Sequence, residues 1–235
     1  MTFTLHFRLF VYLVLGFIAA TVVGTLTHEL GHIAVAKMLG YKTELHYAYM
    51  VHYDSPHELE FYDFYDQNSK VITGNKDPEI IKKFKELRER DKKENLLVVL
   101  GGPLQTMLTG TIGFLLLWFN RKKIGNKLTL VQWVLVFLTF FLSRQVYNFL
   151  SGILFLIIKG KWGHGDDETR ISQLFDLPVW FVGLATALIA AVFLAITVFK
   201  LIPKQQRLTF ITAGIIGSGF GVLIWLKYFG PVILP

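Results

Sequence analysis

Two histidines and a glutamate stand together at the end of a stretch without charge. His28, Glu29 and His32 belong to the sequence His-Glu-Leu-Gly-His, and no acidic, basic or histidine side chain lies between Leu9 and Leu26. Positions four residues apart lie on the same face of a helix, so both imidazoles can bind one metal ion. The glutamate can hold a water molecule at the metal and take its proton. The pattern predicts a zinc site with His28 and His32 as ligands and Glu29 as general base.

The alternative interpretation is two histidines at a helix end beside an incidental glutamate. Three fixed positions are a weak pattern in a soluble helix. Ionisable groups at membrane depth are costly and usually functional, and this consideration favours the metal site here.

Composition points to a chain that lies in a lipid bilayer. Hydrophobic residues make up 53% of the 235 positions, and the mean hydropathy is +0.47. The absence of cysteine excludes disulfides and thiolate zinc ligands. The net charge of +7 does not indicate nucleic-acid binding, because many of the basic residues lie in short loops between apolar segments, where they anchor helix ends at headgroups.

Five apolar segments are long enough to cross a membrane, since about 20 helical residues span its hydrocarbon core. The first passes directly into the histidine motif, so we interpret it as a retained span and not as a cleaved signal peptide. The segments are Leu9–Leu26 (continuing as helix to about Leu39), Leu96–Phe119, Leu128–Ile158, Leu177–Phe199 and Leu208–Tyr228.

The segment Leu128–Ile158 is interrupted by Ser143-Arg144-Gln145, and we interpret it as one long crossing, tilted or broken. One crossing brings the histidines, Gly101-Gly102-Pro103 and the acidic residues after Gly163 to the same membrane face. Two crossings would leave the acidic residues on the opposite side.

The hydrophilic stretch 41–95 separates the first two spans. Thr43 to Tyr53 is rich in aromatic residues, and Tyr47 and Tyr49 share one face under the alternation of a strand. Asp77 to Glu94 carries charges of both signs around a thin apolar edge, which predicts a solvated helix.

These patterns predict an all-α polytopic membrane protein with about five transmembrane helices and a small β-strand-bearing loop after the first helix. Residues 1–40 hold the first transmembrane helix with the histidine motif. Residues 41–95 form an extramembrane or interfacial loop. Residues 96–235 form the remaining transmembrane bundle, with an acidic metal-ligand motif at 163–170.

A tetrahedral catalytic zinc needs a third protein ligand besides two histidines. The acidic trio has a second interpretation as the favourably charged N-terminus of a helix. One acid can bind metal while the others cap that helix. The candidates are Asp166, Asp167, Glu168 and His164, with His46, His52 and His57 in the strand region.

The chain resembles the site-2 protease group of intramembrane zinc metalloproteases. The resemblance rests on the histidine motif in the first span, a Gly-Gly-Pro turn at 101–103, and Asn148 followed by Asp167. It implies zinc binding by His28, His32 and Asp167, with Glu29 as base. The family's aspartate is usually followed by glycine, whereas Glu168 stands here, so Asp166 and Glu168 remain alternatives. The asparagine that the family often has shortly after its Gly-Pro is also absent.

The family also has a strand after the metal helix that can pair with an unwound substrate, which implies substrate binding near Tyr47 and Tyr49. A strand that only lies at the headgroups is the alternative. Asn148 can hydrogen-bond to substrate or to a ligand, or simply join two helices. Arg144, midway along its span, needs a partner such as Asp167, Glu29 or a helix-end carbonyl, or a water path, or it snorkels to the surface.

We therefore predict a zinc-dependent intramembrane endopeptidase that cleaves a membrane protein substrate in or near its transmembrane segment. The cofactor is Zn²⁺, and the partners are the lipid bilayer and the substrate, without nucleic acid. The alternative is a catalytically inactive member of the family that acts as a membrane scaffold or chaperone. A di-iron enzyme would need more histidine motifs than the seven scattered histidines provide. A small-residue face around Gly217 and Gly221 predicts packing inside the bundle.

Overall fold

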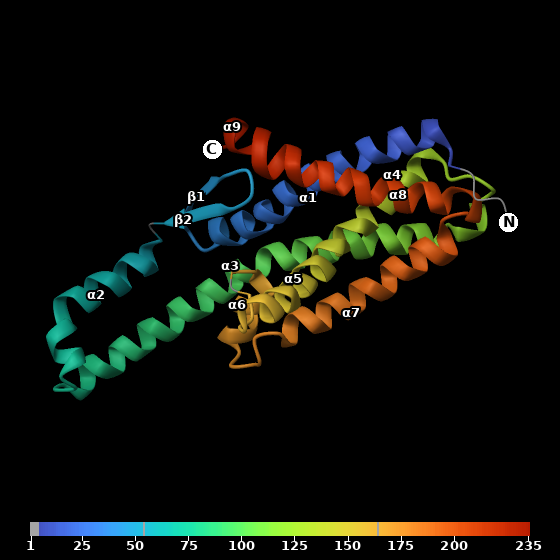
Figure 1. Ribbon diagram of the computed structural model, residues 1–235. Helices are drawn as coiled ribbons and strands as arrows, with labels where there is room; N and C mark the ends of the chain where they lie inside the picture. The colour runs from blue at the N-terminus through green and yellow to red at the C-terminus, as the bar shows by residue number, and fades with distance from the viewer. Residues whose placement is uncertain (1–4, 54, 164) are drawn as a thin grey trace.

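The computed structural model describes residues 5–53, 55–163 and 165–235. It confirms the predicted fold class, a mostly helical chain with a small two-stranded sheet after its first helix (Figure 1). Five helical segments are long and apolar enough to cross a membrane: Phe7–Met38, Pro78–Phe119, Leu130–Lys159, Phe181–Leu201 and Lys204–Ile233.

The helices follow one another with short connections, and three of the five spans change helical pitch along their length. The elements of the bundle are α1 (Phe7–Met38), α3 (Pro78–Phe119), a 3-10 turn (Arg121–Lys123), α4 (Leu130–Thr139), a 3-10 turn (Phe140–Leu142), α5 (Ser143–Lys159), α6 (Asp167–Leu174), α7 (Phe181–Ile196), a π-helical turn (Thr197–Leu201), α8 (Lys204–Gly221), a π-helical segment (Val222–Phe229) and α9 (Gly230–Ile233).

The interrupted third segment is one continuous helical segment, long and apolar enough for a single span, as predicted. Its two halves, α4 and α5, are joined by the 3-10 turn at 140–142 without leaving the helical path. The hydroxyl of Ser143 donates to the carbonyl of Phe140 at 2.6 Å, and that of Thr139 donates to Leu135 at 2.9 Å. Hydroxyls that bond back to the preceding turn are a common cause of such local changes in a helix.

The strand predicted over Thr43–Tyr53 is wrong as a single strand. The segment instead forms an antiparallel hairpin of β1 (Lys42–Leu45) and β2 (Met50–Tyr53), with Leu45 opposite Met50. Tyr47 and Tyr49 lie in the connection, outside both strands. The reversal pairs backbone groups of the two halves with each other, which a lone extended segment would leave without partners.

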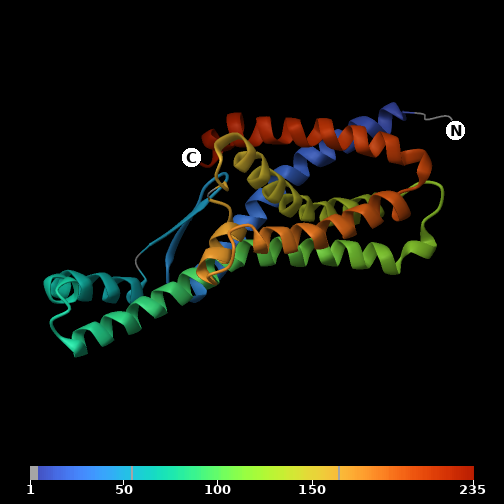
Figure 2. The ribbon, with the colours of Figure 1, turned by 60° about the horizontal axis from the view of Figure 1, so that its bottom comes forward.

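A helix that the sequence analysis did not assign, α2 (Pro56–Thr73), precedes the long α3. Ser55 caps α2 by accepting from the backbone N–H of Glu58 at 3.0 Å. The ring of Phe61 stacks on Phe84 of α3, 5.8 Å between centroids. Together, α2 and the charged half of α3 form an arm that projects from the bundle in both views (Figures 1 and 2). The helix predicted over 77–94 is confirmed and runs unbroken into the second span.

Helix α1 lies against both α3 and α8. A Cβ at Gly217 of α8 would lie 2.7 Å from Cβ of Phe17, and one at Gly221 would lie 2.8 Å from Cβ of Thr21. The small-residue face therefore packs against α1 inside the bundle, as predicted. An aromatic and aliphatic core that includes Phe17, Trp133 and Phe210 joins α1, α4 and α8.

Candidate metal centre

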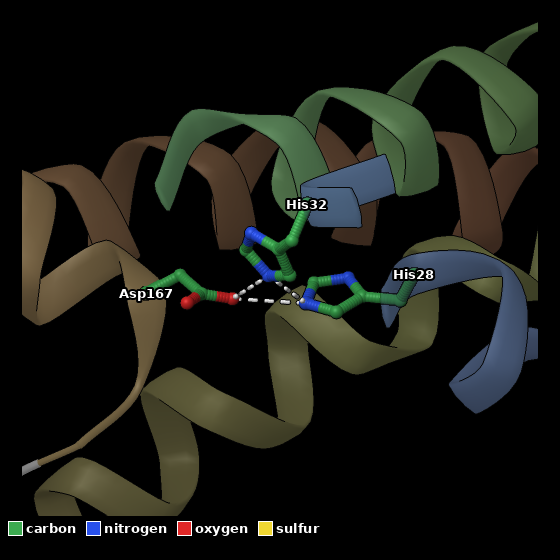
Figure 3. A group of neighbouring side chains, drawn as sticks. All are labelled: His28, His32 and Asp167. Atoms are coloured by element: carbon green, nitrogen blue, oxygen red, sulfur yellow. Dashed lines mark hydrogen bonds and ion pairs between the residues drawn. The ribbon is translucent and has the colours of Figure 1, made fainter. Parts of the chain in front are cut away.

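Three side chains from two distant parts of the chain meet at one point (Figure 3). His28 and His32 come from α1, and Asp167 is the first residue of α6. Oδ2 of Asp167 lies 2.9 Å from Nε2 of His28 and 3.3 Å from Nε2 of His32. The two Nε2 atoms are 3.2 Å apart. Among the described residues, no other group of three His, Cys, Asp or Glu side chains brings its ligand atoms within 4.8 Å of one another.

The histidines are placed by a close crossing of α1 and α3. A Cβ at Gly31 would come 2.5 Å from the carbonyl oxygen of Gly101, so neither position has room for a side chain. Gly102 faces the imidazoles, and a Cβ there would lie 2.6 Å from Nε2 of His28. Small residues allow this approach of two helix backbones. The predicted Gly-Gly-Pro turn is wrong, because α3 continues through Pro103 as helix. The glycines serve the helix contact, not a reversal of the chain.

The Nδ1 nitrogens of both imidazoles contact oxygen atoms of α3. Nδ1 of His32 lies 2.7 Å from the carbonyl oxygen of Val98, and Nδ1 of His28 lies 2.8 Å from Oγ1 of Thr106. A carbonyl only accepts, so Nδ1 of His32 carries a proton and donates it to Val98, which leaves Nε2 on the side of His28 and Asp167. The backbone N–H of Gly102 also approaches this Nδ1, at the longer distance of 3.3 Å, and the shorter bond decides the assignment. This is the arrangement that orients metal-binding histidines.

The acidic trio divides its roles. Asp166 caps α6, since its Oδ1 accepts from the backbone N–H of Thr169 at 2.7 Å. Asp167 points to both histidines. Burial acts to raise the pKa of Asp167, but the hydrogen bonds from His28 and His32 outweigh it and hold that pKa well below its usual range.

Glu168 is not part of the group formed by the two histidines and Asp167. Its Oε2 accepts from Nδ2 of Asn148 at 3.0 Å, and the side chain is buried. Burial raises the pKa of Glu168, which the bond from Asn148 only partly offsets. Of the alternatives for Asn148, the structure has the hydrogen bond between two helices. That bond ties α5 to the residue next to Asp167.

Glu29 and Arg144 lie beside the three ligand atoms, in the wall of a cavity of about 400 Å³. Glu29 is buried, and its Oε1 lies 3.9 Å from Nη2 of Arg144. Of the partners considered for Arg144, this is the one it faces. The cavity reaches from His32 and Asp167 to the hairpin, where Tyr49 lines it. A carboxylate, a cation and three potential ligands therefore share one polar space.

The other histidines considered as ligands lie apart from this group. His57 bonds to Glu94 of α3 at 2.6 Å. His46 stacks on Tyr49 and contacts the carbonyl oxygen of Pro235. His52 lines the cavity with its ring against Tyr41, and burial lowers its pKa. His164 lies outside the described residues.

Tyr47 and Tyr49, the predicted substrate contacts, differ in their surroundings. The backbone N–H of Tyr47 donates to the carbonyl of Leu234 at 3.0 Å, so this position is already paired with the end of the chain. Tyr49 is half-exposed and faces the cavity. Of the two side chains, only Tyr49 lies within reach of a molecule near the metal ligands.

Val98, Gly102 and Thr106 complete the site, and the sequence analysis assigned none of them this role. They stand at intervals of four residues, which places them on one face of α3. That spacing is the signal that links them to each other.

The chain matches no protein-family model, no curated protein and no solved structure.

Proposed function

We propose that the protein is a zinc-dependent intramembrane endopeptidase of the site-2 protease type. The observation that carries this proposal is the meeting of His28, His32 and Asp167, with Glu29 in the same cavity. Of the five helical segments long and apolar enough to cross a membrane, the first three line that cavity, which favours a multi-pass protein acting on substrates within the bilayer.

The donor set supports zinc. Two imidazoles and one carboxylate are a common ligand set for catalytic zinc, with the fourth position left for water or substrate. The missing side chain at Gly102 leaves space beside both Nε2 atoms, so an ion fits among the residues present. The same donors also suit ferrous iron, but iron oxygenases do not need a carboxylate base next to a ligand. Glu29 therefore favours hydrolysis.

A bound zinc ion would supply a Lewis acid that polarises a peptide carbonyl and makes water a better nucleophile. Glu29 accepts the proton of the attacking water on a carboxylate oxygen. It then gives that proton to the nitrogen of the leaving amine. Asp167 would add a negatively charged carboxylate to the two imidazoles that hold the ion.

The substrate class follows from the surroundings of the cavity. A second cavity of about 510 Å³ lies between α1, α5 and α8 and is lined mainly by apolar side chains, among them Phe17, Phe141 and Leu226. The two cavities share Ala48, Arg144 and Asn148 in their walls. An apolar segment of a membrane protein would occupy the second cavity and reach the metal ligands beside these residues.

Metal analysis of the purified protein tests the proposal. We expect about one zinc per chain in the wild type, by analogy with other three-ligand sites. His28→Ala and Asp167→Ala should lose that zinc. Asp166→Asn and Glu168→Gln are matched controls that remove neighbouring charges and should retain it, because Asp166 caps α6 and Glu168 faces Asn148.

Activity separates an enzyme from a scaffold. Glu29→Gln should keep the zinc and lose all cleavage of membrane-protein substrates reconstituted with the protein in vesicles. If the wild type holds zinc but cleaves no more substrate than Glu29→Gln does, the scaffold or chaperone is favoured. A wild type that holds iron or no metal would reject the zinc peptidase.

A further inference from the structure

Arg144 is a partly buried cation with unused hydrogen-bonding capacity. It stands at the start of α5, just after the 3-10 turn, and about a third of its side chain is exposed. Nη2 faces Oε1 of Glu29 at 3.9 Å, which is beyond hydrogen-bond distance. Nε is shielded from solvent and has no hydrogen-bond partner among the described residues. A guanidinium has five N–H donors, so donors remain for another acceptor.

The position of Arg144 is as informative as its spare donors. It lines both the metal cavity and the apolar cavity between α1, α5 and α8. A chain that reached from the apolar cavity to the metal ligands would pass this side chain. Two neighbouring side chains of the cavity already donate elsewhere, since Asn148 donates to Glu168 and Arg170 donates to Asn95 at 3.3 Å.

We propose that Arg144 is a catalytic residue that donates a hydrogen bond to the carbonyl oxygen of the scissile peptide bond as negative charge develops there. The proposal rests on the proposed endopeptidase function and adds a residue to it. Donors aimed at such an oxygen in a water-poor site give some of the largest single contributions to hydrolysis.

The charge balance of the reaction explains why the cation faces Glu29. Before attack, the negative charge lies on the Glu29 carboxylate beside Arg144. The water oxygen then bonds to the carbonyl carbon, one water proton moves to Glu29, and the π electrons of the C=O bond move to its oxygen. Glu29 is now neutral, and the negative charge has moved to the former carbonyl oxygen.

Arg144 keeps a negative partner in both states, so no unpaired charge arises in a low-dielectric site. When the C–N bond breaks, the electron pair on the oxygen re-forms a C=O bond and Glu29 returns its proton to the leaving nitrogen. The products are a carboxylic acid and an amine, which accounts for one water and one peptide bond. Glu29 is again ionised beside Arg144.

A merely structural role would be different. In that case, Arg144 only anchors Glu29. Its loss would then weaken the binding of ligands that imitate the ground state and of ligands that imitate the transition state by similar factors. Binding of two small probes to the zinc-loaded protein separates the two roles. One probe is leucine hydroxamate, a planar chelator, and the other is N-phosphoryl-Leu-Phe, whose tetrahedral anionic phosphoryl group imitates the charged oxygen.

Calorimetric titration of wild type, Arg144→Gln and Arg144→Lys is the primary experiment. We expect Arg144→Gln to weaken the phosphoryl dipeptide about 100-fold to 1000-fold, the loss typical of one such donor. The hydroxamate should weaken by less than about threefold, the small effect expected when only a solvent-screened ion pair is lost. Arg144→Lys should lie between wild type and Arg144→Gln, because an ammonium keeps the charge but not the planar fork.

Arg170→Gln is the matched control, because Arg170 lines the same cavity and carries the same charge. It should leave the ratio of the two affinities unchanged. Zinc content and the melting temperature of each variant are measured alongside, so that a misfolded variant is recognised. If Arg144→Gln does not fold, the affinities of Arg144→Lys for the two probes test the proposal. An equal loss for both probes, or no loss for the phosphoryl dipeptide, would overturn the proposal.

Chemical rescue supplies a second readout. With any substrate that the wild type cleaves and Glu29→Gln does not, Arg144→Ala should lose kcat with little change in KM. Added guanidinium ion at millimolar concentration should restore part of kcat in Arg144→Ala and none in Glu29→Gln. If the wild type holds zinc and cleaves the substrate, but Arg144→Ala keeps its kcat and shows no rescue, the role of Arg144 is rejected. The endopeptidase proposal then still stands. Absence of zinc in the wild type would reject the endopeptidase itself.

Discussion

Gly102 of α3 lies directly against the imidazole of His32, so that a Cβ at position 102 would overlap Nε2 of His32. The same Cβ would lie 2.6 Å from Nε2 of His28. Neither imidazole could take its present position if residue 102 carried a side chain. Glycine at position 102 therefore allows both the close packing of α1 on α3 and the approach of the two Nε2 atoms.

Gly102→Ala should weaken zinc binding by about fivefold to 100-fold, because one added methyl in a packed site costs about 1–3 kcal/mol. The measurement is competition for zinc with a chelator of known affinity. Gly24→Ala is the control on α1, since a Cβ there meets Phe141 at an ordinary 3.6 Å. Wild-type zinc affinity in Gly102→Ala would mean that the two Nε2 atoms do not share an ion.

Thr106→Val tests the support of the metal ligands. Valine keeps the shape of the side chain but removes the oxygen that lies 2.8 Å from Nδ1 of His28. Loss of such a partner lowers metal affinity about 10-fold to 100-fold. Thr109→Val, one turn further along α3, removes a hydroxyl that accepts from Gln105 and should leave zinc affinity unchanged. Equal affinities in the two variants would contradict the role of Thr106.

The meeting of the two histidines with the acidic trio could be predicted from the sequence. His28 and His32 share a face through helical spacing alone, and a single crossing of Leu128–Ile158 brings residues 166–168 to the same end of the bundle. The choice of Asp167 among the three acids came from the family resemblance. The partners of the Nδ1 nitrogens of the two histidines could not be predicted in this way. Val98 and Thr106 meet the histidines only through the rotation of α3 against α1, which depends on Gly31 and Gly101 packing at close range.

The hairpin and the arm show the other limit of sequence patterns. Alternating aromatic residues continue through Tyr47 and Tyr49, so the pattern alone cannot reveal that the chain reverses there. Helix α2 lacks a broad apolar face and buries none of its residues completely. It is stabilised by its contact with α3, centred on Phe84, and not by a periodic pattern of its own.

Phe84→Ala should therefore release α2 from α3. The ring of Phe84 lies 5.8 Å from the rings of both Phe61 and Tyr65, and its removal leaves α2 without its main apolar contact. Limited proteolysis should cut within 56–73 faster than in the wild type, while zinc content stays the same. Tyr62→Ala is the control on α2, because Tyr62 is exposed. Unchanged proteolysis in Phe84→Ala would show that other contacts hold the arm.

His52 should make the fold sensitive to acid. Its imidazole lies against the ring of Tyr41, and burial, aided by Arg170, lowers its pKa below the ordinary 6.5, while Glu58 and Asp91 oppose the shift. In the unfolded chain, His52 takes up a proton near pH 6.5, whereas the folded protein takes it up only at lower pH. The free energy of unfolding therefore falls as the pH drops below about 6.5.

The variant His52→Phe keeps a ring against Tyr41 but cannot bind a proton. Its melting temperature should fall less between about pH 8 and pH 5.5 than that of the wild type, over the range in which an unfolded histidine titrates. His6→Phe serves as a control because His6 is exposed at the start of α1. Parallel pH profiles for His52→Phe and the wild type would refute this source of acid sensitivity.

The connection between β1 and β2 is held by the last part of the chain. Nε1 of Trp225 donates to the carbonyl of Tyr47 at 2.8 Å, and the backbone N–H of Tyr47 donates to the carbonyl of Leu234 at 3.0 Å. Ala48 and Tyr49, the next two residues, line the metal cavity. The position of this cavity wall therefore depends on the C-terminal helix.

Trp225→Phe removes one of these hydrogen bonds and retains an aromatic ring. One such bond contributes about 0.5–1.5 kcal/mol, so amide hydrogen exchange across residues 46–49 should become about twofold to tenfold faster. Zinc content should not change, since no ligand is touched. Trp118→Phe, at the opposite end of α3 from the arm, is the control and should leave exchange at 46–49 as in the wild type. If exchange across residues 46–49 stays at the wild-type rate in Trp225→Phe, the hairpin keeps its place without the C-terminal helix, and the cavity wall is set by the pairing of β1 with β2 alone.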